Sequence, residues 1–183
     1  MPRPASEVVV RIAREDEYEA IGALTVAGYQ ADGYLTRANG SYDDGYAGWL
    51  ADAAARGRHD TLLVATVDER LVGTVTWCPH GSASAQIAQR PDQGEFRTLS
   101  VDPVARGRGV ARALVQECLD RARAEGLTEV LLCSLDEMTP AHRLYTSMGF
   151  VRRPELDWSP APGTNLLTFS IDMAGEGRRG DGR

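Results

Sequence analysis

The chain has 183 residues, a formal net charge of −6 and 43% hydrophobic residues, which suits one domain of ordinary size with a packed core. The acidic balance disfavours a general affinity for nucleic acid or anionic membranes. Three spaced cysteines without a Cys-x-x-Cys pair indicate free thiols in a reducing cytoplasm, and the three histidines lack metal-ligand spacing. No apolar run reaches transmembrane length and no signal-peptide core follows the first residues. We therefore expect a cytoplasmic protein with no metal, no nucleic-acid partner and no membrane partner.

The N-terminal third predicts one strand and two helices. Residues 8–12 read Val-Val-Val-Arg-Ile, which favours a first strand. Apolar residues at helical spacing from Tyr18 to Gly28 predict a helix, and a second helix is expected from Tyr46 to Ala55. The segment between them is rich in Gly, Asp, Asn and Tyr and is interpreted as a mobile loop. Four aromatic residues here either line a pocket or cover the core: Tyr29, Tyr34, Tyr42 and Trp49.

The middle of the chain predicts a hairpin followed by an irregular strand. Apolar runs at 61–67 and 71–77, separated by a short polar turn, indicate two antiparallel strands. Residues 79–94 are small, polar and proline-bearing, and predict a long loop. The strand at 95–101 carries Phe96 and Leu99, which cannot share a face at strict alternation. An extra residue would reconcile them, so we predict a β-bulge between Arg97 and Leu99.

The remaining residues predict a helix, a crossover and a terminal sheet. A helix at 109–125 leads to a parallel strand at 129–134. A short helix at 139–148 has Pro140 in its first turn, where proline is favoured. Strands are expected at 150–152 and 165–173, with a non-repetitive loop at 154–163 between them. We expect residues 1–173 to form a single domain and residues 174–183 to form a flexible tail.

A basic, glycine-rich loop lies between the strand at 95–101 and the long helix, with the sequence Arg106-Gly107-Arg108-Gly109-Val110-Ala111-Arg112. Glycines let the backbone approach a ligand, and the first N–H groups of a helix attract anions. The loop is not a Walker A sequence, because no Gly-Lys-Ser/Thr follows. It is not a dinucleotide fingerprint either, because Arg112 stands where the third glycine is required. Positive charge at a helix start opposes the dipole, so these arginines indicate an anionic ligand.

Two motifs resemble those of the GNAT superfamily of N-acetyltransferases. Residues 106–111 fit its acyl-CoA loop, Q/R-x-x-G-x-G/A, and residues 141–150 fit its A-x-x-x-Y-x-x-x-G-F segment. The resemblance implies the GNAT fold, an α/β (α+β) arrangement. Its mixed central sheet has about six to seven strands, with a splayed and bulged fourth strand, and about four helices flank it. The resemblance also implies transfer of an acetyl group from the co-substrate acetyl-CoA to a primary amine by direct attack in a ternary complex.

The resemblance assigns donor-binding residues. Backbone groups at 99–101 would pair with the amide-bearing pantetheine arm as an added strand does, and the helix start would take the pyrophosphate. Ser134 stands where the family often has an asparagine that bonds the pantetheine. The predicted set is Leu99, Ser100, Val101, Arg106, Gly107, Arg108, Gly109, Val110, Ala111, Arg112, Ser134 and Arg143.

Glu95 and Tyr145 are the predicted catalytic residues. Glu95 occupies the place of the family's glutamate base and would deprotonate the ammonium, whose ordinary pKa is about 10, through water. The alternative is a solvated glutamate at a strand start, and other candidate bases are His80, Asp32 and Asp157. Tyr145 occupies the place of the family tyrosine whose hydroxyl meets the CoA sulfur. The alternative is a core position, with His142 as the substitute acid.

The acceptor stays open. A small-molecule amine is favoured over a protein lysine or N-terminus. An acidic lining would suit polyamines, aminoglycosides or lysine side chains, and an arginine would suit amino acids. A non-catalytic acyl-CoA sensor would keep the loop but lose Glu95 and Tyr145, and this chain keeps both. A nucleotide-phosphate binder would need only the loop. A homodimer is left open.

Overall fold

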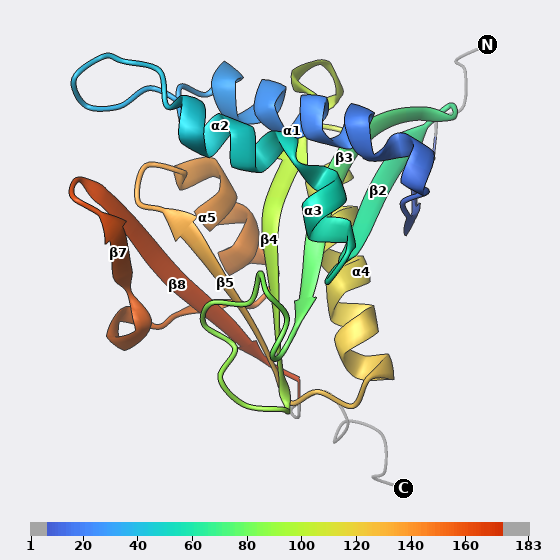
Figure 1. Cartoon of the computed structure of the whole chain (residues 1–183). Helices are drawn as coiled ribbons and strands as arrows, with labels where there is room; N and C mark the ends of the chain where they lie inside the picture. Colours follow the sequence, from blue (N-terminus) through green and yellow to red (C-terminus); the bar gives the residue numbers. More distant parts are fainter. Residues whose placement is uncertain (1–6, 174–183) are drawn as a thin grey trace, which may run out of the picture. The chain divides into compact units, whose positions relative to one another are not determined.

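The computed structural model describes residues 7–173 (Figure 1), and these residues form two compact units. The first unit holds residues 7–77 and 98–118, and the second holds residues 78–97 and 119–173. Strand β4 (Gln93–Val101) and helix α4 (Val110–Ala124) contribute residues to both units. The single domain expected over residues 1–173 stays a prediction, and the predicted tail at 174–183 lies outside the described residues.

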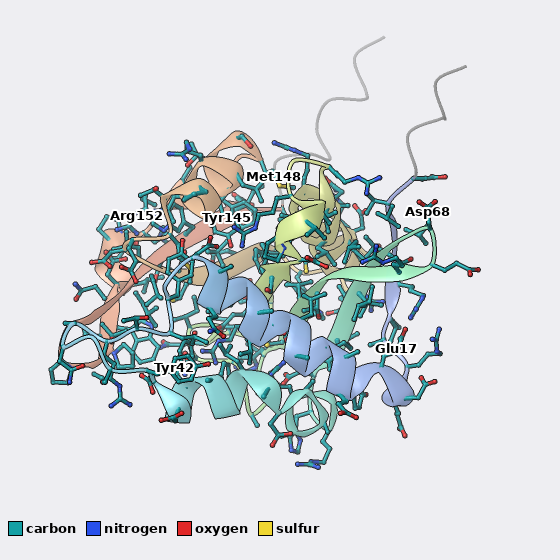
Figure 2. All side chains as sticks on the ribbon, turned by 90° about the horizontal axis from the view of Figure 1, so that it is seen from above. Glu17, Tyr42, Asp68, Tyr145, Met148 and Arg152 are labelled. Atoms are coloured by element: carbon teal, nitrogen blue, oxygen red, sulfur yellow. The ribbon has the colours of Figure 1, made fainter. Side chains whose placement is uncertain are left out.

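The first unit contains a sheet in the order β1-β2-β3-β4, in which the first two pairings are antiparallel. Strand β1 (Val9–Ile12) pairs with β2 (Thr61–Val67), which pairs with β3 (Arg70–Pro79). The predicted hairpin is therefore confirmed. Figure 2 shows Asp68 at its tip, where Asp68 and Glu69 have φ angles of 48° and 64°, as a tight turn between twisted strands requires.

Three helices complete the N-terminal part of this unit: α1 (Tyr18–Ala31), α2 (Asp44–Ala51) and α3 (Ala53–Gly57). The single helix predicted from Tyr46 to Ala55 is wrong, because the chain breaks at Asp52. The Asp52 carboxylate accepts a hydrogen bond from the Ala55 N–H at 2.8 Å and caps the new helix. An aspartate that bonds nearby backbone groups competes with helix continuation, and this explains the break.

Glycines set the separation of the helices from the strands in the first unit. A methyl group built on Gly28 of α1 would lie 2.1 Å from the Ser100 hydroxyl of β4, and one on Gly73 of β3 would lie 2.6 Å from a Val110 methyl of α4. Both distances are too short for real contacts, so only glycine allows these approaches. The two glycines therefore fix where the second half of β4 and the start of α4 sit against their neighbours.

The second unit contains a mixed sheet in the order β4-β5-β8-β6. The first half of β4 pairs in parallel with β5 (Glu129–Leu135), from Gln93 beside Glu129 to Glu95 beside Leu131. Strand β5 pairs over its whole length with the antiparallel strand β8 (Thr164–Asp172), which also pairs with β6 (Val151–Arg152). This confirms the parallel strand predicted after the long helix.

The segment predicted as a non-repetitive loop at 154–163 is largely structured. It forms a 3-10 turn at Pro154–Leu156 and strand β7 (Trp158–Ala161), which pairs with β8. Pro160 lacks a backbone donor and hid the strand pattern, but a strand at a sheet edge tolerates proline. The described residues thus hold eight strands and five helices, one or two more strands and one more helix than expected.

Helix α5 (Thr139–Ser147) packs an aromatic core in the second unit. The Tyr145 ring lies with its centroid 5.9–6.0 Å from those of Phe96, Phe150 and Phe169. In the first unit, Thr98 has a φ of 53° within β4. A β-branched residue rarely adopts this conformation, so the strand is irregular inside the predicted 97–99 window.

Candidate functional site

The predicted anion loop connects β4 to α4 in the first unit. A 3-10 turn at Pro103–Ala105 leads into it, and Gly107 and Gly109 have φ angles of 75° and 79°. Both angles lie in the left-handed region, where only glycine is free of strain. The 15-residue helix α4 then begins at Val110 and has no acidic residue in its first turn. This arrangement exposes residues 106–109 before the positive end of a helix.

Arg106 has a carboxylate partner within the first unit. Its guanidinium binds both oxygens of Asp32, at 2.7 and 2.9 Å, just beyond the end of α1. It also donates to the Gly28 carbonyl oxygen at 3.4 Å. Part of the positive charge predicted for the loop is therefore offset by Asp32, one of the other candidate bases. Arg108 and Arg112 lie exposed on the same loop and helix start.

The backbone at 99–101 lies at the end of β4. The Ser100 side chain is buried and donates to carbonyl oxygens of α1, at Leu24 or Thr25, each 3.4 Å away. Its hydroxyl therefore helps to hold α1, and only its backbone is available for the predicted pairing. Leu99 and Val101 are half-buried.

Glu95 is fully buried in the second unit, with 0% of its surface exposed. Its Oε2 atom accepts hydrogen bonds from the backbone N–H groups of Gln86, Ile87 and Ala88, at 2.8, 2.9 and 3.2 Å. The alternative interpretation of a solvated glutamate is therefore wrong. The Arg97 Nε atom lies 3.8 Å from Oε1, but Oε1 accepts no hydrogen bond from the residues that the structure describes.

Three alternate side chains of β4 hold the preceding loop in place. Besides Glu95, Gln93 accepts hydrogen bonds from the backbone of Gln89 and Arg90, at 2.9 and 3.0 Å. Arg97 donates to the Ser84 carbonyl oxygen at 2.9 Å. The loop predicted at 79–94 is thus an ordered segment, and β4 begins within it at Gln93. Sequence reasoning missed Gln93 and Arg97, although polar residues at period two along a buried strand are a signal that their face has polar partners.

Tyr145 is 5% exposed and lies in the aromatic core of the second unit. The packing of its ring agrees with the alternative interpretation that Tyr145 is a core residue. A buried ring does not exclude a chemical role for its hydroxyl. One turn earlier on α5, the Nε2 atom of His142 lies 3.1 Å from the Ser134 hydroxyl. Burial lowers the pKa of His142 and so favours the neutral ring. Arg143 is exposed on the same helix.

The other candidates have different surroundings. Asp157 binds both terminal nitrogens of Arg152, at 2.9 and 2.6 Å, and this ion pair lowers the pKa of Asp157. His80 is exposed. Among the aromatic residues, Tyr46 stacks on Trp49 and Tyr29 packs edge-on against Tyr34 and Tyr46. Tyr29 is 9% exposed and covers the core, whereas Tyr42 and Trp49 are 40% and 37% exposed, and Tyr34 is half-buried.

The predicted site residues thus fall into two sets. The first unit brings together residues 99–101 and 106–112, and the second unit holds Glu95, Ser134, Arg143 and Tyr145. Within residues 7–173, no group of His, Cys, Asp and Glu side chains is arranged to bind a metal. No helix in that range has both the length and the apolar composition needed to cross a bilayer.

Comparison with known proteins places these features in context. Residues 29–150 match the profile described as the acetyltransferase (GNAT) family. A mycothiol acetyltransferase of Cellulomonas flavigena is 31% identical over 161 residues, which cover 84% of this chain and 44% of that protein. Human N-acetylaspartate synthetase is 31% identical over 103 residues, which cover 56% of this chain and 32% of that protein. The chain thus matches less than half of the length of either relative.

A solved structure shows the same fold. A Salmonella typhimurium protein, determined with its cofactor acetyl-CoA, aligns with a TM-score of 0.61 at 16% identity. The alignment covers 91% of this chain and 94% of that protein. At this level of identity the likeness concerns the fold alone.

Proposed function

The chain belongs to the acetyltransferase (GNAT) family, and we propose that it transfers an acetyl group from acetyl-CoA to a primary amine by direct attack in a ternary complex. The family assignment makes it an acyltransferase. The observation that carries the proposal is the loop at 106–112, where two glycines with positive φ precede a 15-residue helix with no acidic residue in its first turn. Such a helix start suits the pyrophosphate of the donor.

The donor would be held along the loop and the end of β4. The α4 N-terminus, Arg108 and Arg112 bind the phosphates, and Arg106 contributes after exchanging its contact with Asp32. The backbone at 99–101 pairs with the pantetheine arm. The Ser100 side chain is already bonded to α1, and those of Leu99 and Val101 are half-buried, so the backbone is the part of this segment that can bond the arm. Ser134 and Arg143, which belong to the second unit, remain predicted donor contacts.

The reaction forms a bond between the amine nitrogen and the acetyl carbon and breaks the bond from that carbon to sulfur. The acceptor arrives as an ammonium and must first lose a proton. Glu95 receives it through water at Oε1, the oxygen that accepts no hydrogen bond from the described residues. Tyr145 gives its hydroxyl proton to the departing CoA thiolate, and the second proton that the nitrogen loses as the amide forms restores the Tyr145 hydroxyl. Glu95 also fixes the 86–88 backbone, so replacing it changes both proton transfer and the loop.

A small-molecule amine is the favoured acceptor. The two relatives described above are named for small molecules, mycothiol and N-acetylaspartate. This supports a small acceptor over a protein lysine or N-terminus.

The test is a panel of amines assayed with acetyl-CoA by detection of the released thiol. We expect thiol release that depends on both amine and enzyme, and acetyl-CoA should raise the melting temperature whereas ATP should not. Stabilisation by acetyl-CoA without thiol release would favour a non-catalytic sensor, and stabilisation by ATP alone would favour a nucleotide binder. Either result would overturn the proposal.

A further inference from the structure

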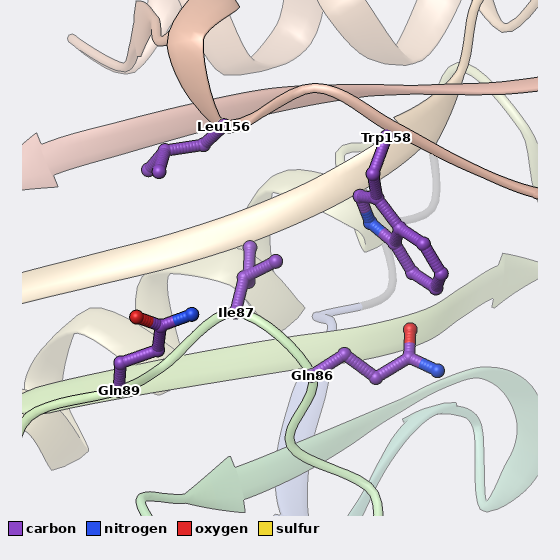
Figure 3. A pocket seen from close by; sticks show the side chains of 5 residues that line it. All are labelled: Gln86, Ile87, Gln89, Leu156 and Trp158. Carbon is purple, nitrogen blue, oxygen red and sulfur yellow. The ribbon is translucent and has the colours of Figure 1, made fainter.

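A pocket in the second unit has no role in the mechanism described above. Its volume is about 200 Å³, and Figure 3 shows its walls. Ile87 lies between two glutamines on one wall, and Leu156 and Trp158 face it from the other. The lining consists of Gln86, Ile87, Gln89, Leu156 and Trp158.

Buried or half-buried polar groups fix both walls. On one side, Glu95 accepts the backbone hydrogen bonds of Gln86 and Ile87. On the other side, the Trp158 indole N–H donates to the Cys133 sulfur at 3.4 Å. The Thr168 hydroxyl donates to the Leu156 carbonyl oxygen at 2.9 Å. The pocket is therefore shaped before a ligand arrives, which reduces the entropy lost on binding.

The lining selects an uncharged ligand group. It contains an indole ring, two aliphatic side chains and two amides, and none of the five side chains carries a charge. An aryl or alkyl group would bury apolar surface against Trp158, Leu156 and Ile87. A carboxylate or a second ammonium would lose its water without gaining a partner of opposite charge among the lining residues.

The wall that bears Gln86 and Ile87 also connects the pocket to Glu95. The N–H groups of these two lining residues point to Oε2 of Glu95, and the other oxygen of that buried carboxylate accepts no hydrogen bond from the described residues. A water bound at Oε1, beside the Arg97 Nε atom 3.8 Å away, would supply the missing donor. We propose that the pocket binds the non-reacting part of the amine acceptor and that this part is an uncharged aryl or alkyl group. The inference rests on the proposed function and narrows its substrate class, disfavouring polyamines and free amino acids.

The experiment compares 2-phenylethylamine with ethylamine, which has the same amine but no ring. The wild type should prefer the aryl amine in kcat/KM by at least about tenfold. Trp158→Ala and Ile87→Ala should each reduce this preference by about fivefold or more, without changing the affinity for acetyl-CoA. Val9→Ala removes methyl groups from a side chain that is 51% exposed in the first unit and should leave the preference unchanged.

A second measurement tests the pocket without turnover. The chain has three tryptophans, so a ¹⁵N-labelled sample gives three indole N–H signals, and Trp158→Phe identifies that of Trp158. Adding 2-phenylethylamine alone should shift this signal, ethylamine should not, and the signal of Trp77, which is 1% exposed, should stay in place. An unmoved Trp158 signal, or an aryl preference that persists in both pocket variants, would overturn the inference. Thiol release in the same experiments would still support the proposed function. If no amine gave thiol release, the proposed function would be wrong, and the pocket would have no role in binding an amine acceptor. A Trp158 shift would then still establish the ligand class of the pocket.

Discussion

At the scale of single residues, Tyr145 combines a packed ring with a proposed chemical role. Its ring contacts three phenylalanines, and Tyr145→Phe would keep those contacts while removing the hydroxyl. If the hydroxyl protonates the thiolate, turnover should fall by about 10²-fold or more with little change in acetyl-CoA affinity. Steady-state kinetics and calorimetry measure the two effects.

The control is Tyr42→Phe, which removes a hydroxyl from a residue that is 40% exposed. It should alter neither turnover nor donor affinity. Unchanged turnover in Tyr145→Phe, under conditions where the chemical step limits the rate, would leave Tyr145 with a packing role alone.

Glu17 ties the start of α1 to β1 through a charged hydrogen bond. Its carboxylate binds Arg11 at 2.6 Å and accepts the Arg14 backbone N–H at 2.8 Å, and the Arg11 contact is the main cause that lowers the Glu17 pKa to about 2. A carboxylate with a lowered pKa stabilises the fold above its ordinary pKa of about 4.5 and loses this contribution as the pH falls toward 2. Glu17→Gln should therefore cost about 1–3 kcal/mol of unfolding free energy at pH 7 and much less near pH 2.5.

Urea unfolding at several pH values measures this difference. Glu15→Gln changes an exposed glutamate of the same turn and should have a small effect at every pH. A Glu17→Gln cost that stays constant from pH 7 to pH 2.5 would contradict the assignment.

At the scale of elements, the loop before α4 depends on backbone conformation more than on side chains. Gly109 and Gly40 have φ angles of 79° and 81°, and a methyl group on either would meet nothing within 4 Å. Alanine at both positions should therefore cost a similar strain, about 1 kcal/mol. Only Gly109→Ala should weaken acetyl-CoA binding, by about tenfold or more, because only this loop is proposed to bring its backbone to the phosphates.

Calorimetry with acetyl-CoA and thermal unfolding of both variants separate strain from binding. Equal donor affinities in Gly109→Ala and Gly40→Ala would remove the loop from the donor site.

At the scale of the whole molecule, local signals predicted most of the elements and long-range contacts accounted for most of the errors. The hairpin, β5, α4 and α5 follow from periodicity and turn residues, which act over a few positions. The burial of Glu95 could not be predicted, because it depends on the 86–88 backbone folding onto β4. The site loop was found from its glycines and arginines, but the pairing of Arg106 with Asp32 spans 74 positions and has no local signature.

Sequence patterns also concealed two features. Pro160 masked strand β7, and an apolar helical pattern masked the break at Asp52. At Pro160 the missing N–H disguises a strand, and at Asp52 one side chain ends a helix. In both places one residue overrides the secondary structure that its neighbours favour.

The protein has a net charge of −6, and the proposed donor is also an anion. The ion pair between Arg106 and Asp32 therefore affects how strongly the protein attracts this donor. A phosphate that takes Arg106 replaces one anion with another, so the attraction gained there is the difference between two ion pairs. The displaced carboxylate would then stand uncompensated just past the end of α1, next to the segment that leads to α2. Binding of the donor would thus make the electrostatic potential at the end of α1 more negative, although α1 is far in sequence from the 106–112 loop.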